Sequence, residues 1–337
     1  MELYTLWFIL IAILYAGYFV LDGFDLGVGM LLPFLARDDA RRRVMLNSVG
    51  PHWNANEVWL LLAGGATFAA FPNWYATLFS GFYFPLFLVL IGLILRGVAF
   101  ELRSKDDNPR WRSFWDWAIC IGSALPALLL GVAFANFVRG VPLDDKMNYV
   151  GGFWNLLNPY ALLGGLVSLT GFLLVGASYL SLKTSGNLME KAQSASKRLW
   201  ILVLVLAVVF AGTSYVSTDM IANGITAIPT QILTLAALLG VGWVLSKKRY
   251  GWGFILIALA IILATATIFL MLYPRVLVSY PNPEFSLTVS NSSSGPNTLT
   301  TMTIVTIIML PIVLAYQVWA YWIFRKKISG STKEIEY

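Results

Sequence analysis

Two carboxylates lie inside the first long apolar stretch of this chain, at Asp22 and Asp25. A spacing of three residues places both side chains on one face of a helix. A charge inside a bilayer costs at least about 2.5 kcal/mol, so ionisable residues at such positions usually line an ion path or pair with a buried partner. The two aspartates therefore indicate a proton or ion route, or a buried partner.

Further polar residues are expected at the depth of these aspartates. If Trp7 lies at the outer interface, a helix that rises 1.5 Å per residue reaches the inner boundary near Asp25. Counted inward from the ends of the neighbouring segments, the same inner half of the membrane holds His52, Asn54, Asn56, Glu57, Arg96, Glu101 and Asp116. Chains of carboxylates of this kind build proton paths through membranes. The alternative is that Arg96 neutralises one carboxylate and that the other charges are solvated at the interface.

The elements that position these residues are membrane helices. Of the 337 residues, 58% are hydrophobic and 12% are charged, which is typical of an integral membrane protein. About 20 apolar residues cross a bilayer. The expected fold is therefore all-α, with nine transmembrane helices over residues 5–32, 51–71, 74–102, 114–138, 159–182, 199–218, 224–245, 252–273 and 299–324. Residues 38–48 are expected to form an amphipathic helix on the inner surface.

The basic residues predict the orientation of these helices. Nineteen of the 23 Lys and Arg residues, Lys333 among them, fall in alternate loops or in the C-terminal tail. Because cytoplasmic loops carry the excess of Lys and Arg, the N-terminus is expected outside and the C-terminus inside. The net charge of +6 is explained by inner loops beside anionic lipid, so no nucleic-acid partner is expected.

The order of the helices predicts a division of the chain. Residues 1–150 would form a first four-helix bundle with the inner acidic cluster, and residues 151–274 a second four-helix bundle. Residues 275–298 would form an outer loop. Residues 299–337 would then hold a peripheral ninth helix and a basic inner tail.

Cofactor ligands are scarce in this composition. The single cysteine, Cys120, excludes an internal disulfide and an iron–sulfur cluster held by this chain alone. The single histidine, His52, excludes a haem held by two histidines of this chain. No metal site and no catalytic residue are expected here, so any redox chemistry belongs mainly to another subunit.

Several stretches of the first 103 residues resemble subunit II of the cytochrome bd quinol oxidases. The matching segments are Asp22-Gly23-Phe24-Asp25-Leu26-Gly27-Val28-Gly29, Gly50-Pro51 with Trp53, Asn56-Glu57-Val58-Trp59, Ala63-Gly64-Gly65-Ala66, Phe68-Ala69-Ala70-Phe71-Pro72 and Arg96-Gly97-Val98-Ala99-Phe100-Glu101-Leu102-Arg103. Beyond them the chain matches in length, hydropathy and topology.

The resemblance implies a subunit of a membrane complex that oxidises quinol and reduces oxygen to water. Subunit I would hold two b-type haems, haem d and the quinol site, and a small single-helix subunit and membrane lipid are further candidate partners. The complex would lie in the cytoplasmic membrane of a prokaryote. It would separate charge without pumping protons. This chain would support assembly and offer an inner proton route.

The resemblance also implies roles for single residues. Asp25 matches a carboxylate of the inner proton route, with Asp22, Glu57 and Glu101 as further members, and Trp53 matches a tryptophan near the haems, with Trp59 on the same helix. Members of the family commonly have an aspartate where this chain has Asn54. Asparagine carries no proton at ordinary pH, so we expect His52 to compensate.

Two other functions fit the same residues. Acidic residues in membrane helices also suit a proton-coupled transporter, although such a protein is expected to have polar residues in both halves. In the second alternative, the chain is a structural scaffold and its acidic cluster serves packing only.

Overall fold

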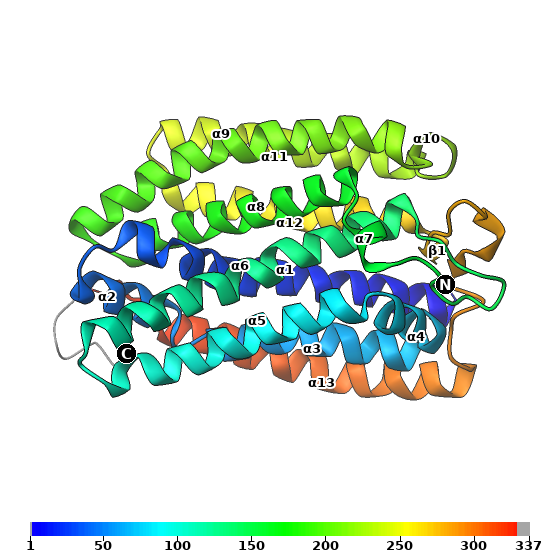
Figure 1. Ribbon diagram of the computed structural model, residues 1–337, viewed down its shortest axis with the longest axis horizontal. Helices are drawn as coiled ribbons and strands as arrows, with labels where there is room; N and C mark the ends of the chain where they lie inside the picture. The colour runs from blue at the N-terminus through cyan, green and yellow to red at the C-terminus, as the bar shows by residue number, and fades with distance from the viewer. Residues whose placement is uncertain (1, 329–337) are drawn as a thin grey trace.

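The computed structural model describes residues 2–328, and long helices that run side by side along its longest axis make up most of this part of the chain (Figure 1). The predicted all-helical class is confirmed. The long helices are α1 (Leu3–Leu35), α3 (Trp53–Ala70), α5 (Tyr83–Leu102), α6 (Pro109–Arg139), α8 (Pro159–Lys183), α9 (Gly186–Ser217), α11 (Ile228–Ser246), α12 (Tyr250–Leu272) and α13 (Pro296–Ile323).

Short elements connect these helices. They are α2 (Asp39–Val49), α4 (Pro72–Gly81), α7 (Phe153–Leu156), α10 (Met220–Asn223), the 3-10 helices η1 (Arg103–Lys105), η2 (Ile225–Ala227) and η3 (Pro283–Phe285), and the strands β1 (Arg275–Leu277) and β2 (Leu287–Thr288). The two strands pair antiparallel in the loop before α13. The predicted surface helix over 38–48 is α2, whose first turn is capped because the Asp38 carboxylate accepts a hydrogen bond from the Arg41 amide at 2.9 Å.

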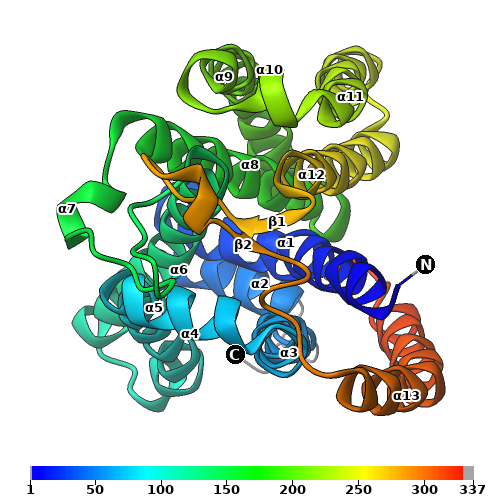
Figure 2. The same cartoon turned by 90° about the vertical axis from the view of Figure 1, so that its right-hand side faces the viewer.

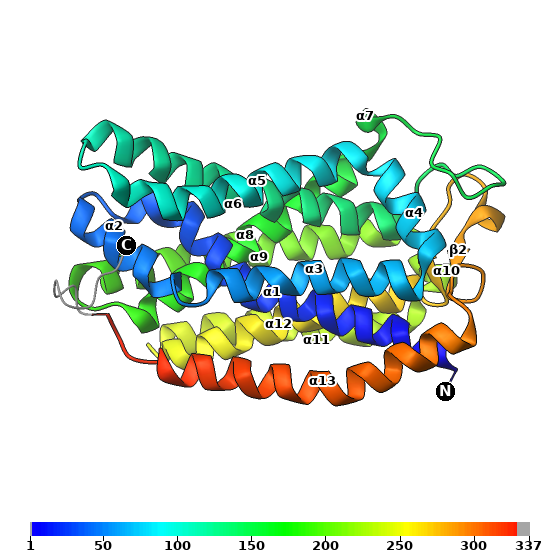
Figure 3. The same ribbon diagram turned by 90° about the horizontal axis from the view of Figure 1, so that it is seen from below.

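Within residues 2–328, eight helices are long and apolar enough to cross a membrane. They are α1, α5 with η1, α6, α8, α9, α11 with η2, α12 and α13. The predicted segment 51–71 is the helix α3, which runs beside the others (Figure 3) but carries Asn54, Asn56 and Glu57 in its first two turns. The first turn of α1 and the last turn of α13 lie at opposite ends of the long axis (Figure 3). The count of nine spans and the orientation stay predictions.

Several predicted boundaries differ from the structure, and two of the differences are large. The segment 74–102 is divided into α4 and α5, because the backbone at Phe82 leaves the helical region (φ −97°, ψ 19°). The segment 199–218 begins earlier, since α9 starts at Gly186. The additional turns are polar, and hydropathy alone does not detect a helix that continues beyond the apolar stretch.

Helix α1 lies at the centre and packs against α3, α6, α8 and α12 (Figure 2). Its closest approach is to α8, where a Cβ atom on Gly27 would lie 1.9 Å from the Phe172 carbonyl oxygen. Only glycine permits such an approach of two helix backbones. Helix α13 lies at the margin and contacts α1 and α3 (Figure 2). The division of the chain at residues 150, 274 and 298 stays a prediction, and residues 329–337 of its last part, with Lys333, lie outside the described residues.

Candidate functional site

One arginine joins two carboxylates from different helices inside the bundle. Nη2 of Arg96 on α5 donates to Oδ1 of Asp22 on α1 at 2.8 Å and to Oε2 of Glu57 on α3 at 2.9 Å. Asp22 and Arg96 are 0% and 1% exposed, whereas Glu57 is partly exposed. A buried charge of this kind is tolerated only with a partner. Three helices are therefore tied together at one point by opposite charges.

Asp25 lies on the same face of α1 and has a different partner. Its Oδ2 atom accepts a hydrogen bond of 2.7 Å from Nδ2 of Asn56 on α3. The Asn56 oxygen in turn accepts hydrogen bonds from Nε2 of Gln317 at 3.0 Å and from the hydroxyl of Tyr321 at 2.9 Å, both on α13. Asp25 is 2% exposed. The carboxylate is thus buried and is held by a neutral amide, with no direct ion pair among the described residues.

Several polar atoms around these carboxylates make no hydrogen bond to any described residue. They are the Tyr18 hydroxyl, Asp22 Oδ2, Asp25 Oδ1, Arg96 Nε and Arg96 Nη1. Tyr18, Asp22 and Asp25 follow one another at intervals of four and three residues, so they share one face of α1. Buried polar groups in proteins are almost always hydrogen-bonded, often to ordered water. This face of α1 therefore has the donors and acceptors that internal water would use.

Two of the predicted path residues lie apart from this group. Glu101, near the end of α5, and Asn54, in the first turn of α3, are both exposed on the surface of the chain. His52, just before α3, is buried and stacks on the ring of Tyr321 with centroids 4.3 Å apart.

The two predicted tryptophans occupy different environments. Trp53 is half-buried and stacks on Phe100 of α5, with ring centroids 5.2 Å apart and planes within 6°. Trp59 is buried and packs against α1, where a Cβ atom on Gly17 would lie 2.6 Å from its ring. Trp59 therefore belongs to the core of this chain, and Trp53 keeps part of its surface open.

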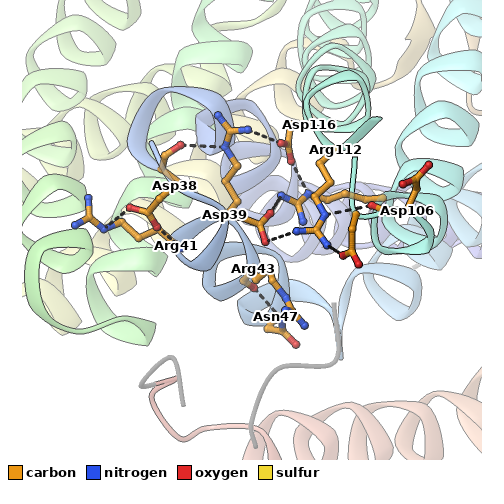
Figure 4. Close-up of polar contacts among 12 residues, drawn as sticks. Asp38, Asp39, Arg41, Arg43, Asn47, Asp106, Arg112 and Asp116 are labelled. Carbon is orange, nitrogen blue, oxygen red and sulfur yellow. Dashed lines mark hydrogen bonds and ion pairs between the residues drawn. The ribbon is translucent and has the colours of Figure 1, made fainter. Parts of the chain in front are cut away.

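A second charged cluster, the α2 cluster, holds α2 against the ends of α5 and α6 (Figure 4). Asp116, which is 1% exposed, accepts hydrogen bonds of 2.7 Å from Nε of Arg103 and from Nη1 of Arg42. Asp39 accepts from Arg103 at 2.7 Å and from Arg112 at 2.9 Å. Arg112 also pairs with Asp107. Three arginines and three aspartates balance in charge, and within this network the pair of Arg103 and Asp116 is buried on both sides.

Residues of the two networks that the sequence did not single out follow recognisable patterns. Gln317 and Tyr321 are four residues apart, so they share one face of α13, where they interrupt an otherwise apolar helix. Arg103, at the end of the apolar part of α5, resembles an ordinary interfacial arginine. Its role becomes visible only when Asp116 and Asp39 are placed beside it.

The side chains of this chain offer little to a metal or a haem. Among the described residues, no group of three or more His, Cys, Asp or Glu side chains is arranged to hold a metal ion. The one histidine has a tyrosine ring stacked on its face and Phe324 against its edge. Its Nε2 atom is buried and makes no hydrogen bond to a described residue.

Comparison with known proteins relates this chain to one protein family. The family model of cytochrome bd terminal oxidase subunit II matches residues 3–324. The chain is 42% identical over 329 residues to the cytochrome bd ubiquinol oxidase subunit 2 of Bacillus subtilis, with 97% of each chain covered. It is 37% identical over 363 residues to the cytochrome bd-I ubiquinol oxidase subunit 2 of Escherichia coli, with 98% of this chain and 95% of that one covered.

A solved structure has the same fold. The bd oxidase from Geobacillus thermodenitrificans superimposes with a TM-score of 0.77 at 18% sequence identity, over 97% of this chain and 100% of that chain. Both close relatives are aligned over nearly their full length, and the motifs around Asp25, Glu57 and Arg96 fall within the matched residues. The chain therefore belongs to the cytochrome bd terminal oxidase subunit II family.

Proposed function

We propose that this chain is the subunit II of a cytochrome bd-type quinol oxidase in the cytoplasmic membrane of a prokaryote. It crosses the membrane nine times, with its N-terminus outside, and supports the assembly of subunit I. The relatives that are aligned over nearly the full length of this chain are named as subunits 2 of cytochrome bd ubiquinol oxidases, and these names support the oxidase assignment. Subunit I holds the haems and the quinol site. This is consistent with a chain that has a single histidine and a single cysteine.

We propose further that Asp25 passes protons from the inner face toward the oxygen-reducing site of subunit I. The observation that carries this proposal is the row of unpartnered polar atoms on one face of α1, which reaches from Tyr18 past Asp22 to Asp25. Water bound by these atoms would connect the carboxylates by hydrogen bonds. Reduction of oxygen to water consumes protons, and a buried carboxylate with a free oxygen can take up and release one.

The net charge of the buried acids and Arg96 favours the uptake and release of a proton. Asp22, Asp25 and Glu57 are three acids, and Arg96 is the one cation in contact with them among the described residues. With every acid ionised, the group would carry a net charge of −2 in a nonpolar environment, which is costly. A proton that moves among the three acids relieves this cost. Arg96 fixes two of the acids, so Asp25 is the one that exchanges most readily.

A purely structural role for the same residues is the second candidate. The observation that favours it is that Arg96 binds carboxylates on two other helices and so holds α1, α3 and α5 together. In that case the acids would matter for assembly and not for turnover. The rival proton-coupled transporter predicts activity in the isolated chain, whereas our proposal predicts that haem and oxidase activity copurify with a second subunit.

Asp25→Asn distinguishes the proton path from the scaffold. The change keeps size and hydrogen bonding but removes the ionisable group, so we expect quinol oxidation by the purified complex to fall at least about tenfold while the haem spectrum stays intact. Asp145→Asn, in an exposed outer loop, is the matched control and should keep full turnover. Full turnover of Asp25→Asn, with normal charge separation in proteoliposomes, would refute the proton path. Loss of the haem signal would favour the scaffold.

A further inference from the structure

The least packed of the long helices, α13, is linked by hydrogen bonds to the interior carboxylate. Only 6% of its most apolar stretch is buried within the chain. Nevertheless Gln317 and Tyr321, one turn apart on its inner face, both donate to the side-chain oxygen of Asn56. Asn56 donates in turn to Asp25. One amide thus stands between the peripheral helix and the proposed proton-carrying group.

The neighbours of Asn56 leave its amide a single orientation. Its nitrogen faces the backbone carbonyl of Leu21 at 3.2 Å as well as Oδ2 of Asp25 at 2.7 Å. A carbonyl oxygen only accepts hydrogen bonds, so the NH₂ group must face α1. The amide oxygen then faces α13, where Gln317 and Tyr321 supply two donors. All four hydrogen bonds that an asparagine side chain can make are present.

This arrangement determines which groups act on Asp25. The charged groups nearest to it are Asp22 on its own helix, Glu57 on α3 and Arg96 on α5. Tyr179 on α8 and Tyr321 on α13 are the titratable hydroxyls that face it. Of the groups on these five helices, Asn56 alone makes a hydrogen bond to the Asp25 carboxylate among the described residues. Oδ2 is therefore held by the amide, and Oδ1 is left to exchange a proton.

We propose that Asn56 is a positioning residue for Asp25, and that α13 fixes its orientation through Gln317 and Tyr321. The inference rests on the proposed role of Asp25 and adds the residues that orient its carboxyl group. Without the two donors on α13, the amide oxygen loses both of its hydrogen bonds, and only the contacts of the amide nitrogen with α1 would hold the Asn56 side chain in place. The carboxylate would then lose its fixed direction, and a misplaced acid or base transfers protons more slowly.

The test uses the whole complex with single and double changes on α13. Gln317→Leu and Tyr321→Phe each remove one donor and nearly preserve volume, and Tyr321→Phe keeps the stack on His52. Tyr316→Phe, at a residue that is 59% exposed on the same helix, is the matched control. We expect the double variant to lose roughly tenfold in turnover, and both single variants to shift the pH profile of oxygen uptake in the same direction. The control should retain the parental profile.

The outcomes separate this inference from the proposed function. If Asp25→Asn impairs turnover but the α13 variants keep the parental rate and pH profile, the positioning role is refuted and the proton path stands. If Asp25→Asn has no effect, the proposed function itself fails. If the α13 variants lose the complex and its haem spectrum, their donors serve assembly, which also refutes positioning. A shifted profile with an intact haem spectrum supports the inference.

Discussion

Nε of Arg103 lies 2.7 Å from Oδ1 of Asp116, and each side chain is 1% exposed. This pair joins the end of α5 to the second turn of α6, and Arg42 adds α2 through the other oxygen of Asp116. The short helix between α1 and α3 is therefore fixed to the bundle by charge. His52 and Trp53 follow α2 after two intervening residues, so their positions depend on this contact.

Replacement of Asp116 tests the strength of the α2 cluster. Asp116→Asn removes the negative charge that two arginines share and replaces one acceptor oxygen with an NH₂ donor. The buried Arg103 then has only Asp39 as an anionic partner, which is expected to cost about 3 kcal/mol. The midpoint of thermal unfolding of the purified complex measures the loss. Asp107→Asn, at a side chain that is 98% exposed, is the control and should cost under about 1 kcal/mol. Equal losses in the two variants would contradict the buried character of this network.

Removal of the Arg96 guanidinium is expected to prevent assembly. Arg96→Leu leaves Asp22 and Glu57 without their shared cation, and an uncompensated buried charge costs roughly 3–5 kcal/mol. The amount of haem-containing complex recovered from membranes is the measurement. Arg110→Leu, at an exposed residue in the first turn of α6, should give the parental yield. Normal yield and activity of Arg96→Leu would show that the ion pairs are dispensable.

The backbone contact between α1 and α8 is expected to tolerate no side chain. Gly27→Ala would place its Cβ atom 1.9 Å from the Phe172 carbonyl oxygen, so the helices must separate. Overpacking of this kind costs about 1–3 kcal/mol. The thermal midpoint should fall, whereas Gly64→Ala, whose Cβ meets no atom within 4 Å in this chain, should leave it unchanged or raise it. An unaltered midpoint in Gly27→Ala would mean that the two helices adjust freely.

The sequence predicted which polar residues lie at one level along the helices better than the direction in which they point. Asp22, Glu57 and Arg96 were expected at one level, and they form ion pairs. Glu101 is expected at the same level but lies five residues after Arg96, about 140° around the helix, and is exposed. Asn54 and Asn56 differ by about 200° in the same way. Rise along a helix is read directly from the chain, whereas rotation depends on which neighbour packs against which face.

The partners of Asp25 could not be predicted from the sequence for a different reason. Asn56 and Tyr321 are 265 residues apart, and no local pattern relates them. The neutral side chains of Gln317 and Tyr321 converge on the amide of Asn56 and leave no charge signal, since asparagine, glutamine and tyrosine are ordinary residues at the ends of membrane helices. The ion pairs of the α2 cluster could not be predicted for a similar reason. Each of its arginines lies in a predicted inner loop, where an excess of Lys and Arg is expected from the orientation alone.

The hydrogen bonds that link α13 to the rest of the chain also fix its height in the bilayer. Near its start, Nε1 of Trp7 donates to the carbonyl of Leu299 and to Thr303, and near its end Gln317 and Tyr321 donate to Asn56. Thr303 and Gln317 are 14 residues apart, about 21 Å along the axis. A slip of one turn, about 5.4 Å, would break both sets at once. Lipid alone would allow this helix to slide along its axis, and the two sets of hydrogen bonds therefore hold it in one axial register.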